Sequence, residues 1–224
     1  MNIVAASLAG SHLKSQRGER MTLAEFDNEY RKEYKIVCGC DEAGRGPLAG
    51  DVFAAAVIFD EDTVIEGIND SKKLTAKKRE ALFDEIIEKA LDFSIQCSTV
   101  SEIEDINILN AAMLAMKRSV ESMKTKPDIC LIDGNKTPDL ECKAEAVIKG
   151  DAKSQAVAAA SILAKVARDR YMLDMAKKYP EYQFEKHKGY GTKLHYEMLD
   201  KYGESPIHRP SFLKKYYEKR SKQP

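Results

Sequence analysis

Two adjacent carboxylates and a glycine-rich stretch occur together in Asp41-Glu42-Ala43-Gly44-Arg45-Gly46, directly after an apolar run. Two acids so close resist ionising together, and a hard divalent cation, which prefers carboxylate oxygens, relieves that repulsion. Glycines let another backbone approach closely, and the planar fork of arginine suits a phosphate group. The stretch therefore predicts a site for a metal ion and a phosphate. The alternative interpretation is an ordinary β-turn with a surface ion pair.

Two later apolar runs also end in acids, at Asp133 and at Asp151. Functional groups of an open α/β sheet gather where strand ends meet, so we expect these acids to join Asp41 and Glu42. Four carboxylates around one or two Mg²⁺ or Mn²⁺ ions are typical of phosphodiester hydrolysis by activated water. The sequence contains no nucleophilic serine elbow, His-Glu-x-x-His or Walker loop that would support another mechanism. Zinc is disfavoured because there are only four histidines.

The composition predicts a globular protein with a substantial core, because 43% of the 224 residues are hydrophobic. No run approaches the roughly 18 apolar residues that a membrane span needs, and the first residues lack the basic leader of a signal peptide. The five cysteines form no Cys-x-x-Cys pair and lie mostly in apolar runs, which predicts buried thiols in a reducing compartment. We therefore expect a cytoplasmic protein that does not contact a membrane.

Charge is balanced overall but unevenly distributed along the chain. There are 36 basic and 36 acidic residues. Residues 186–224 contain ten Lys/Arg against four Asp/Glu (+6), whereas residues 60–106 contain six against thirteen (−7). The basic end is suited to face a polyanion such as a nucleic acid, although a charged run is more often only a solvated surface.

The apolar patterns predict a mixed α/β domain led by a β-hairpin. Strands are expected at 36–40 and 52–59, and the eleven residues between them are too few for a parallel crossover, so they should pair antiparallel. The first acid pair then lies at or near the rim of the hairpin. Further strands are expected at 93–100, at 128–133 and from 145 toward Asp151. Helices are expected from the Thr22 capping box to about 32, at 75–91, at 107–123 after a capping box at Ser101, and at 154–178, 192–202 and 211–219.

Several blocks of the chain, in order, resemble the signature of the type 2 ribonuclease H family, bacterial ribonuclease HII. The blocks include Asp41-Glu42-Ala43-Gly44-Arg45-Gly46-Pro47-Leu48-Ala49-Gly50, Asn69-Asp70-Ser71-Lys72-Lys73-Leu74, Leu131-Ile132-Asp133-Gly134, Lys149-Gly150-Asp151-Ala152-Lys153-Ser154, residues 158–170, His187-Lys188-Gly189-Tyr190-Gly191-Thr192-Lys193 and Pro206-Ile207-His208-Arg209. The resemblance implies a ribonuclease-H-like fold, a mixed sheet flanked by helices with a helical C-terminal region. It also implies hydrolysis of the RNA strand of RNA–DNA hybrids and incision 5′ to ribonucleotides embedded in duplex DNA.

By position, the resemblance assigns roles to individual residues. It implies that the metal-binding and catalytic carboxylates are Asp41, Glu42, Asp133 and Asp151. It implies that Gly44, Arg45 and Gly46 sense the ribonucleotide junction, that Tyr190 packs on the neighbouring deoxyribose, and that Lys72 contacts a phosphate. Charge alone adds Lys73, Lys186 and Lys188 to the substrate path. We expect the cofactor to be Mg²⁺ or Mn²⁺, one or two ions, and the product ends to be 3′-hydroxyl and 5′-phosphate.

The resemblance also suggests how the chain is divided. We expect an N-terminal extension with a short helix (1–33), a ribonuclease-H-like catalytic domain (34–185) and a basic helical C-terminal region packed on it (186–224). We expect a monomer that acts on RNA–DNA hybrids and on ribonucleotide-containing duplexes in replication and repair. Asp51 stands where the family usually has proline, which adds a carboxylate near the site and could weaken phosphate binding or change the rigidity of the turn.

Two other functions remain open from the sequence. A junction resolvase on the same fold would need no sensor for the 2′-hydroxyl, so the Gly-Arg-Gly stretch and Tyr190 argue against it. A non-catalytic hybrid-binding module would have clustered acids that repel phosphate when no metal is bound, so the four retained carboxylates argue against it.

Overall fold

In the computed structural model, which describes residues 21–221, five strands form one mixed sheet in the order β3-β2-β1-β4-β5. The strands are β1 (Val37–Ala43), β2 (Val52–Ile58), β3 (Asp92–Ser98), β4 (Ile129–Asp133) and β5 (Lys143–Val147). Antiparallel pairing joins β1 to β2 and β2 to β3, whereas β1, β4 and β5 run parallel. The predicted hairpin and the predicted mixed sheet are both confirmed.

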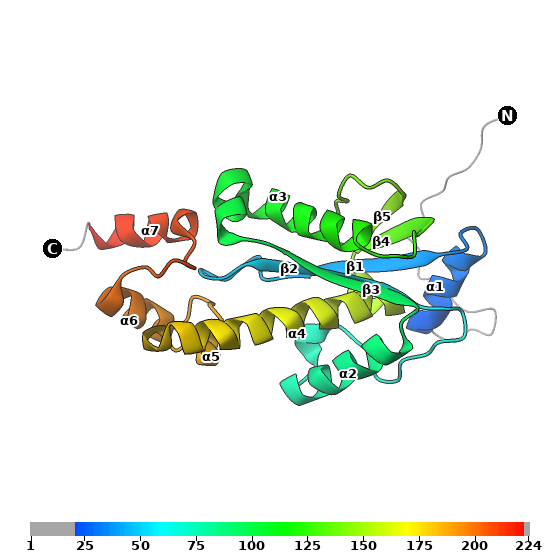
Figure 1. The fold of residues 1–224 in the computed structure, drawn as a ribbon, viewed down its shortest axis with the longest axis horizontal. Coiled ribbons are helices and arrows are strands. Elements are labelled where there is room, and N and C mark those ends of the chain that lie inside the picture. The colour runs from blue at the N-terminus through cyan, green and yellow to red at the C-terminus, as the bar shows by residue number, and fades with distance from the viewer. Residues whose placement is uncertain (1–20, 222–224) are drawn as a thin grey trace.

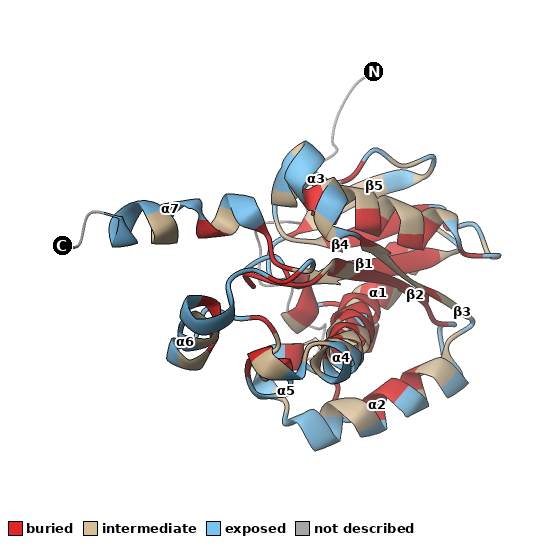
Figure 2. Cartoon of the chain, turned by 60° about the vertical axis from the view of Figure 1, so that its left-hand side comes forward, coloured by how far each residue is buried: buried red, intermediate tan, exposed pale blue. Residues whose placement is uncertain are grey.

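Helices cover both faces of this sheet (Figure 1). The longer helices are α1 (Leu23–Arg31), α2 (Ala76–Lys89), α3 (Val100–Glu121), α4 (Gln155–Lys178), α6 (Lys193–Tyr202) and α7 (Pro210–Arg220). One core lies between α3 and the sheet, and another lies between the sheet, α4 and α2. Figure 2 shows the buried residues on the strands and on the inner faces of these helices.

The central helix α4 packs unusually close to β1 because both elements carry small residues. Ala158, Ala159 and Ala160 are fully buried. A Cβ added at Gly39 of β1 would lie 2.2 Å from the backbone of Ala156, so this position of the strand has no room for a side chain. This close packing fixes β1 against α4.

Four local predictions were wrong. The strand expected from 145 toward Asp151 is β5, which ends at Val147, and Asp151 lies on a separate short turn. The first strand does not end at Cys40, because Asp41 pairs with Ala55 and Glu42 pairs with Ala54, so both acids lie inside β1. The capping box of α3 is formed by Thr99 and Glu102, and the helix begins about seven residues earlier than the pattern indicated. The pattern failed there because Asn107, at φ 65°, interrupts the helical backbone and shifts the apolar spacing.

The C-terminal elements attach to the catalytic sheet through α4 and through the loop that follows β1. A short turn η4 (Pro180–Tyr182), α5 (Phe184–His187) and α6 follow α4, and an isolated β-bridge joins Ala49 to His208. At the opposite end of the sheet, α1 contacts β1 and α4. The division into three regions stays a prediction. Across residues 21–221, no helix is long and apolar enough to cross a membrane.

Candidate active site

The predicted acids are brought to one edge of the sheet by the parallel pairing of β1 and β4. Cys40 pairs with Ile132, so the next residues, Asp41 and Asp133, occupy neighbouring positions on adjacent strands. Asp151 lies on a short turn, η3 (Gly150–Ala152). The N–H group of Gly150 donates a hydrogen bond of 2.7 Å to Oδ1 of Asp133, which ties this turn to the end of β4. Residues more than a hundred positions apart in the sequence thus meet here.

Burial and mutual repulsion disfavour the charged forms of these carboxylates. Burial raises the pKa of Asp41 well above its ordinary value, and Glu42 and Asp133 raise it further. Burial also raises the pKa of Glu42, although Arg45 partly offsets that effect. The pKa of Asp151 is raised by burial, then by Asp133 and by Asp70. The acids therefore influence one another electrostatically, as groups that share a cation do.

Three of the four carboxylates nevertheless have a hydrogen-bond partner of their own, Asp133 through the N–H of Gly150. Oδ1 of Asp41 accepts a hydrogen bond from the N–H of Glu42 at 2.7 Å, and Glu42 pairs with Arg45 at 3.2 Å. Within residues 21–221, no three or more His, Cys, Asp or Glu side chains are already grouped as ligands of one metal ion.

Lys72 provides a second positive charge near the acids, besides Arg45. It lies on the turn η2 (Ser71–Lys73), whose N-cap Asp70 accepts the N–H of Lys72 at 2.9 Å. Burial lowers the pKa of Lys72, but attraction to Asp41 and to the other nearby acids outweighs burial and raises it. The structure thus places Lys72 beside the predicted acids. It also adds Asp70, which the sequence analysis did not single out as an acid of the site.

The glycine-rich loop that follows β1, residues 44–50 (the 44–50 loop), has a conformation that demands glycine at its start. Gly44 has φ +104°, and a Cβ there would lie 2.1 Å from Nε of Arg168. A Cβ at Gly46 would meet no atom within 4 Å, so the space beside Gly46 is open. Arg45 is half exposed, at 51% of its side chain. The loop therefore has a packed inner side and an accessible outer side.

Two fully buried arginines hold this loop from inside the protein. Arg209 donates hydrogen bonds to the carbonyl oxygens of Gly44, Arg45, Pro47 and Gly50, at 2.5–3.1 Å. Arg168 donates to the carbonyl oxygens of Ala49, Asp51 and Lys188, at 3.0–3.2 Å. The sequence analysis gave neither arginine a role, because a charged residue in a sequence indicates exposure unless its partners are known.

Tyr190 lies next to the 44–50 loop, as its predicted role requires. The N–H of Leu48 donates to the carbonyl of Gly189 at 2.8 Å, which joins the two segments directly. The ring of Tyr190 is 41% exposed, and its centroid lies 5.7 Å from the guanidinium of Arg168 and 5.6 Å from Nζ of Lys165. An exposed aromatic ring flanked by cations is suited to pack on a sugar and a phosphate.

The side chain of Asp51, whose effect on phosphate binding stays a prediction, is bound to the start of α3. Its Oδ1 accepts the N–H of Val100, the first residue of α3, at 3.0 Å. Burial raises the pKa of Asp51, while Arg209 and Arg168 lower it. The carboxylate therefore supports the start of α3 and faces the buried arginines.

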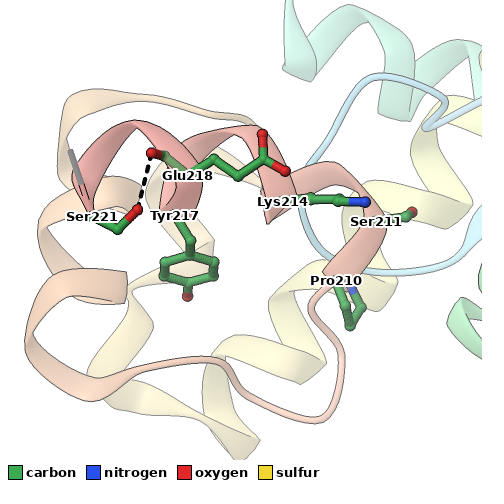
Figure 3. Close-up of a pocket in the computed structure, with 6 residues that line it drawn as sticks. All are labelled: Pro210, Ser211, Lys214, Tyr217, Glu218 and Ser221. Atoms are coloured by element: carbon green, nitrogen blue, oxygen red, sulfur yellow. Dashed lines mark hydrogen bonds between the residues drawn. The ribbon is translucent and has the colours of Figure 1, made fainter.

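A hollow of about 670 Å³ on the C-terminal helix is separate from this site (Figure 3). Pro210, Lys214 and Tyr217 line it with three further residues of α7 and its end, and none of the predicted site residues contributes. Its lining offers neither clustered acids nor histidines.

A mixed five-stranded sheet with acids on its two central neighbouring strands defines the class of ribonuclease-H-like nucleases. The family model "Ribonuclease HII" matches residues 38–215. Ribonuclease HII of Caldicellulosiruptor bescii is 55% identical over 201 residues, which is 87% of this chain and 98% of that protein. Ribonuclease HII of Idiomarina loihiensis is 59% identical over 177 residues, 79% of this chain and 95% of that protein. The chain therefore belongs to the ribonuclease HII family and is an endonuclease.

The comparison of folds agrees with this assignment. The crystal structure of ribonuclease H2 from Pyrococcus horikoshii matches with a TM-score of 0.69 and 30% sequence identity, over 84% of this chain and 100% of that one. The predicted fold class and family are thus confirmed, whereas the roles of single residues stay predictions.

Proposed function

We propose that this enzyme hydrolyses the RNA strand of RNA–DNA hybrids and incises 5′ to ribonucleotides embedded in duplex DNA. The observation that carries the proposal is the convergence of acids from β1, β4 and η3 beside the 44–50 loop and Tyr190. The acids would support hydrolysis of a phosphodiester, and the neighbouring 44–50 loop and the ring of Tyr190 would recognise a sugar.

The residues that would hold Mg²⁺ or Mn²⁺, one or two ions, are Asp41, Glu42, Asp133 and Asp151. They fit a hard divalent cation because they are all carboxylates, and because burial and then mutual repulsion raise the pKa of Asp41 and of Asp151. Such an ion supplies a water activated for attack and stabilises charge on the leaving oxygen. The chain positions the acids, and Gly150 fixes Asp133 through its N–H. The products would be 3′-hydroxyl and 5′-phosphate ends.

Substrate recognition is proposed for Gly44, Arg45, Gly46, Lys72 and Tyr190. The 2′-hydroxyl distinguishes RNA from DNA, and the backbone at glycines can approach it where a side chain would collide. The open space beside Gly46 is consistent with that approach. Arg45 and Lys72 would contact phosphates, and Tyr190 would pack on the deoxyribose beside the ribonucleotide.

We also propose that the enzyme is a cytoplasmic monomer that acts in replication and repair. All five cysteines are free thiols, and Cys38, Cys40 and Cys130 are buried together in the core beneath α3. Free thiols in that number are expected in a reducing compartment.

The test is cleavage of a duplex that contains one embedded ribonucleotide, with Mg²⁺, with Mn²⁺ and with a chelator. We expect a cut 5′ to the ribonucleotide in the presence of either metal, and a loss of at least about a hundredfold in Asp133→Asn, since a transition-state charge interaction of this kind is worth about 3 kcal/mol. The Asn side chain retains an oxygen for the N–H of Gly150, so the fold should survive. Asp139→Asn is the matched control, because Asp139 is a fully exposed acid.

Other outcomes would favour the rival functions. Binding of the hybrid without cleavage in either metal would indicate a binding module. Cleavage of an all-DNA four-way junction, with no preference for the ribonucleotide, would indicate a resolvase.

A further inference from the structure

Three histidines of the C-terminal region, His187, His195 and His208, form one buried cluster around Phe184. The rings of His187 and His195 stack with centroids 4.3 Å apart. None of them belongs to the acidic edge of the sheet. The position of His187 within the cluster is that of a packing residue.

The hydrogen bonds of this cluster run in one direction from Ser205 to Tyr190. The N–H of Ser205 donates to Nδ1 of His208 at 2.7 Å, so the proton of that neutral ring is on Nε2. Nε2 of His208 lies 2.9 Å from Nε2 of His195 and donates to it. The remaining proton of His195 is therefore on Nδ1, which donates to the carbonyl oxygen of Tyr190 at 3.0 Å. The backbone of Tyr190 is thus the last acceptor of a two-histidine chain.

This contact matters because the segment that carries Tyr190 is not a regular element. Lys188 and Gly189 both have positive φ, at 50° and 83°. The N–H of Tyr190 donates to the carbonyl of His187 at 2.9 Å, and its carbonyl is fixed by His195. The carbonyl of Tyr190 also accepts the N–H of Thr192 at 2.8 Å, so both polar backbone groups of Tyr190 are held, and its exposed side chain projects from a fixed backbone.

The same C-terminal segment also holds the other recognition element. His208 is followed directly by Arg209, which binds four carbonyl groups of the 44–50 loop. The N–H of Gly50 donates to the carbonyl of Ile207 at 2.8 Å. His208 and Arg209 are consecutive and therefore fix both elements to which we assign the reading of the sugar. His208 fixes Tyr190 through His195, and Arg209 binds the 44–50 loop directly.

We propose that His195 and His208 are positioning residues that hold Tyr190 at a fixed place beside the 44–50 loop and so determine the preference for a deoxyribonucleotide–ribonucleotide junction. The inference rests on the proposed function of Tyr190. Neither histidine touches the acids or the substrate. Their loss reduces cutting at a single embedded ribonucleotide more than it reduces cutting of a continuous RNA–DNA hybrid, where the sugar-reading contact is less selective.

The test uses the fact that asparagine and glutamine replace different ring nitrogens. The amide N–H of Asn approximates Nδ1 of histidine, and that of Gln approximates Nε2. At position 195, His195→Asn keeps the donor to Tyr190 whereas His195→Gln loses it. At position 208 the order reverses, since His208→Gln keeps the donor to His195 and His208→Asn loses it. A role in volume alone would not reverse in this way.

The measurement is kcat/KM of the full chain on a duplex with one ribonucleotide and on a continuous hybrid, with thermal unfolding of every variant. We define the ratio as kcat/KM on the single-ribonucleotide duplex divided by kcat/KM on the continuous hybrid. We expect His195→Gln and His208→Asn to lower this ratio about tenfold, which corresponds to the loss of one buried hydrogen bond. His195→Asn and His208→Gln should stay within about threefold of the wild-type ratio. Equal losses on both substrates, or the same rank of Asn and Gln at both positions, would overturn the inference.

A double variant separates this inference from the proposed function. If His195 acts through Tyr190, then His195→Gln added to Tyr190→Ala changes the ratio little further, whereas an additive loss would overturn the inference. If Tyr190→Ala alone leaves junction cutting intact, the role proposed for Tyr190 fails. If Tyr190→Ala loses junction cutting but His195→Gln keeps the wild-type ratio, only the positioning role of His195 fails.

Discussion

Nη2 of Arg209 donates a hydrogen bond of 2.7 Å to the carbonyl oxygen of Gly44, a residue 165 positions earlier in the chain. The guanidinium is fully buried, and burial together with neighbouring Arg168 lowers its pKa to about 9. Backbone carbonyl dipoles are its hydrogen-bond partners, and five of its bonds reach the 44–50 loop. The C-terminal region therefore supports, from inside the protein, the loop that follows Asp41 and Glu42.

Arg209→Lys should destabilise the protein even though it preserves the charge. Lysine has a single nitrogen and lacks the planar fork, so several of the buried carbonyls lose their donor, at about 1–3 kcal/mol each. We expect the free energy of unfolding in urea to fall by about 3 kcal/mol. Arg220→Lys on α7 is the control, because Arg220 is half exposed and should change stability little. Equal effects of the two substitutions on the free energy of unfolding would contradict the role of Arg209 in holding the 44–50 loop.

Gly44→Ala and Gly46→Ala should differ sharply although they are two residues apart. Gly44 has φ +104° and its Cβ would collide with Arg168, whereas a Cβ at Gly46 meets nothing within 4 Å. Gly44→Ala should therefore lower the free energy of unfolding by more than about 1 kcal/mol, and Gly46→Ala should leave it nearly unchanged. If Gly46 lies against the substrate, Gly46→Ala should still weaken cleavage of the single-ribonucleotide duplex. A stable Gly44→Ala protein would show that the loop is not fixed by Arg168.

Asp27→Asn should change how stability depends on pH. Asp27, on α1, accepts the N–H of Ala156 at 2.9 Å, and burial raises its pKa to about 6 in spite of hydrogen bonds to Ser154 and the attraction of Arg31. An acid with a raised pKa stabilises the fold below its unfolded pKa near 3.8, and this contribution is lost as pH rises through 6.

The stability of the wild type relative to Asp27→Asn should therefore fall by about 3 kcal/mol between pH 4 and pH 7. Urea unfolding of both proteins at these two pH values measures the difference. Asp84→Asn, at an exposed acid of α2, serves as the comparison. If the difference in the free energy of unfolding between wild type and Asp27→Asn is the same at both pH values, then folding does not raise the pKa of Asp27.

Divalent ions should stabilise the fold through the proposed carboxylates. An ion at ten times its dissociation constant adds about 1.4 kcal/mol when it binds only the folded state. We expect Mg²⁺ or Mn²⁺ to raise the thermal midpoint of the wild type, a chelator to reverse that rise, and Asp41→Asn to abolish it. A rise that survives both Asp41→Asn and Asp133→Asn would place the ion elsewhere.

The sheet and the acids were predictable because their signals are local. Apolar runs ending in Asp41 and Asp133 indicate strand ends, and the eleven-residue spacing requires a hairpin. The exact end of β1 was not predictable, since pairing of Glu42 with Ala54 depends on the partner strand and not on the polarity of Glu42. The kink at Asn107 likewise hid the true start of α3.

The support beneath the site left no comparable signal in the sequence. Arg168 is one charged residue among several on α4, and only the fold shows that it is buried against carbonyl groups of distant loops. His195 and His208 are likewise separated by a helix end and a turn. Roles that depend on tertiary partners of a charged or titratable residue require coordinates, whereas roles that depend on a strand end do not.

Lys72 supplies a positive charge of the chain itself to its most acidic region. Attraction to Asp41, Asp70, Asp151 and Asp133 outweighs the effect of burial and raises the pKa of Lys72. The ammonium group therefore offsets part of the repulsion among these carboxylates, which lets them be buried near one another in the folded chain.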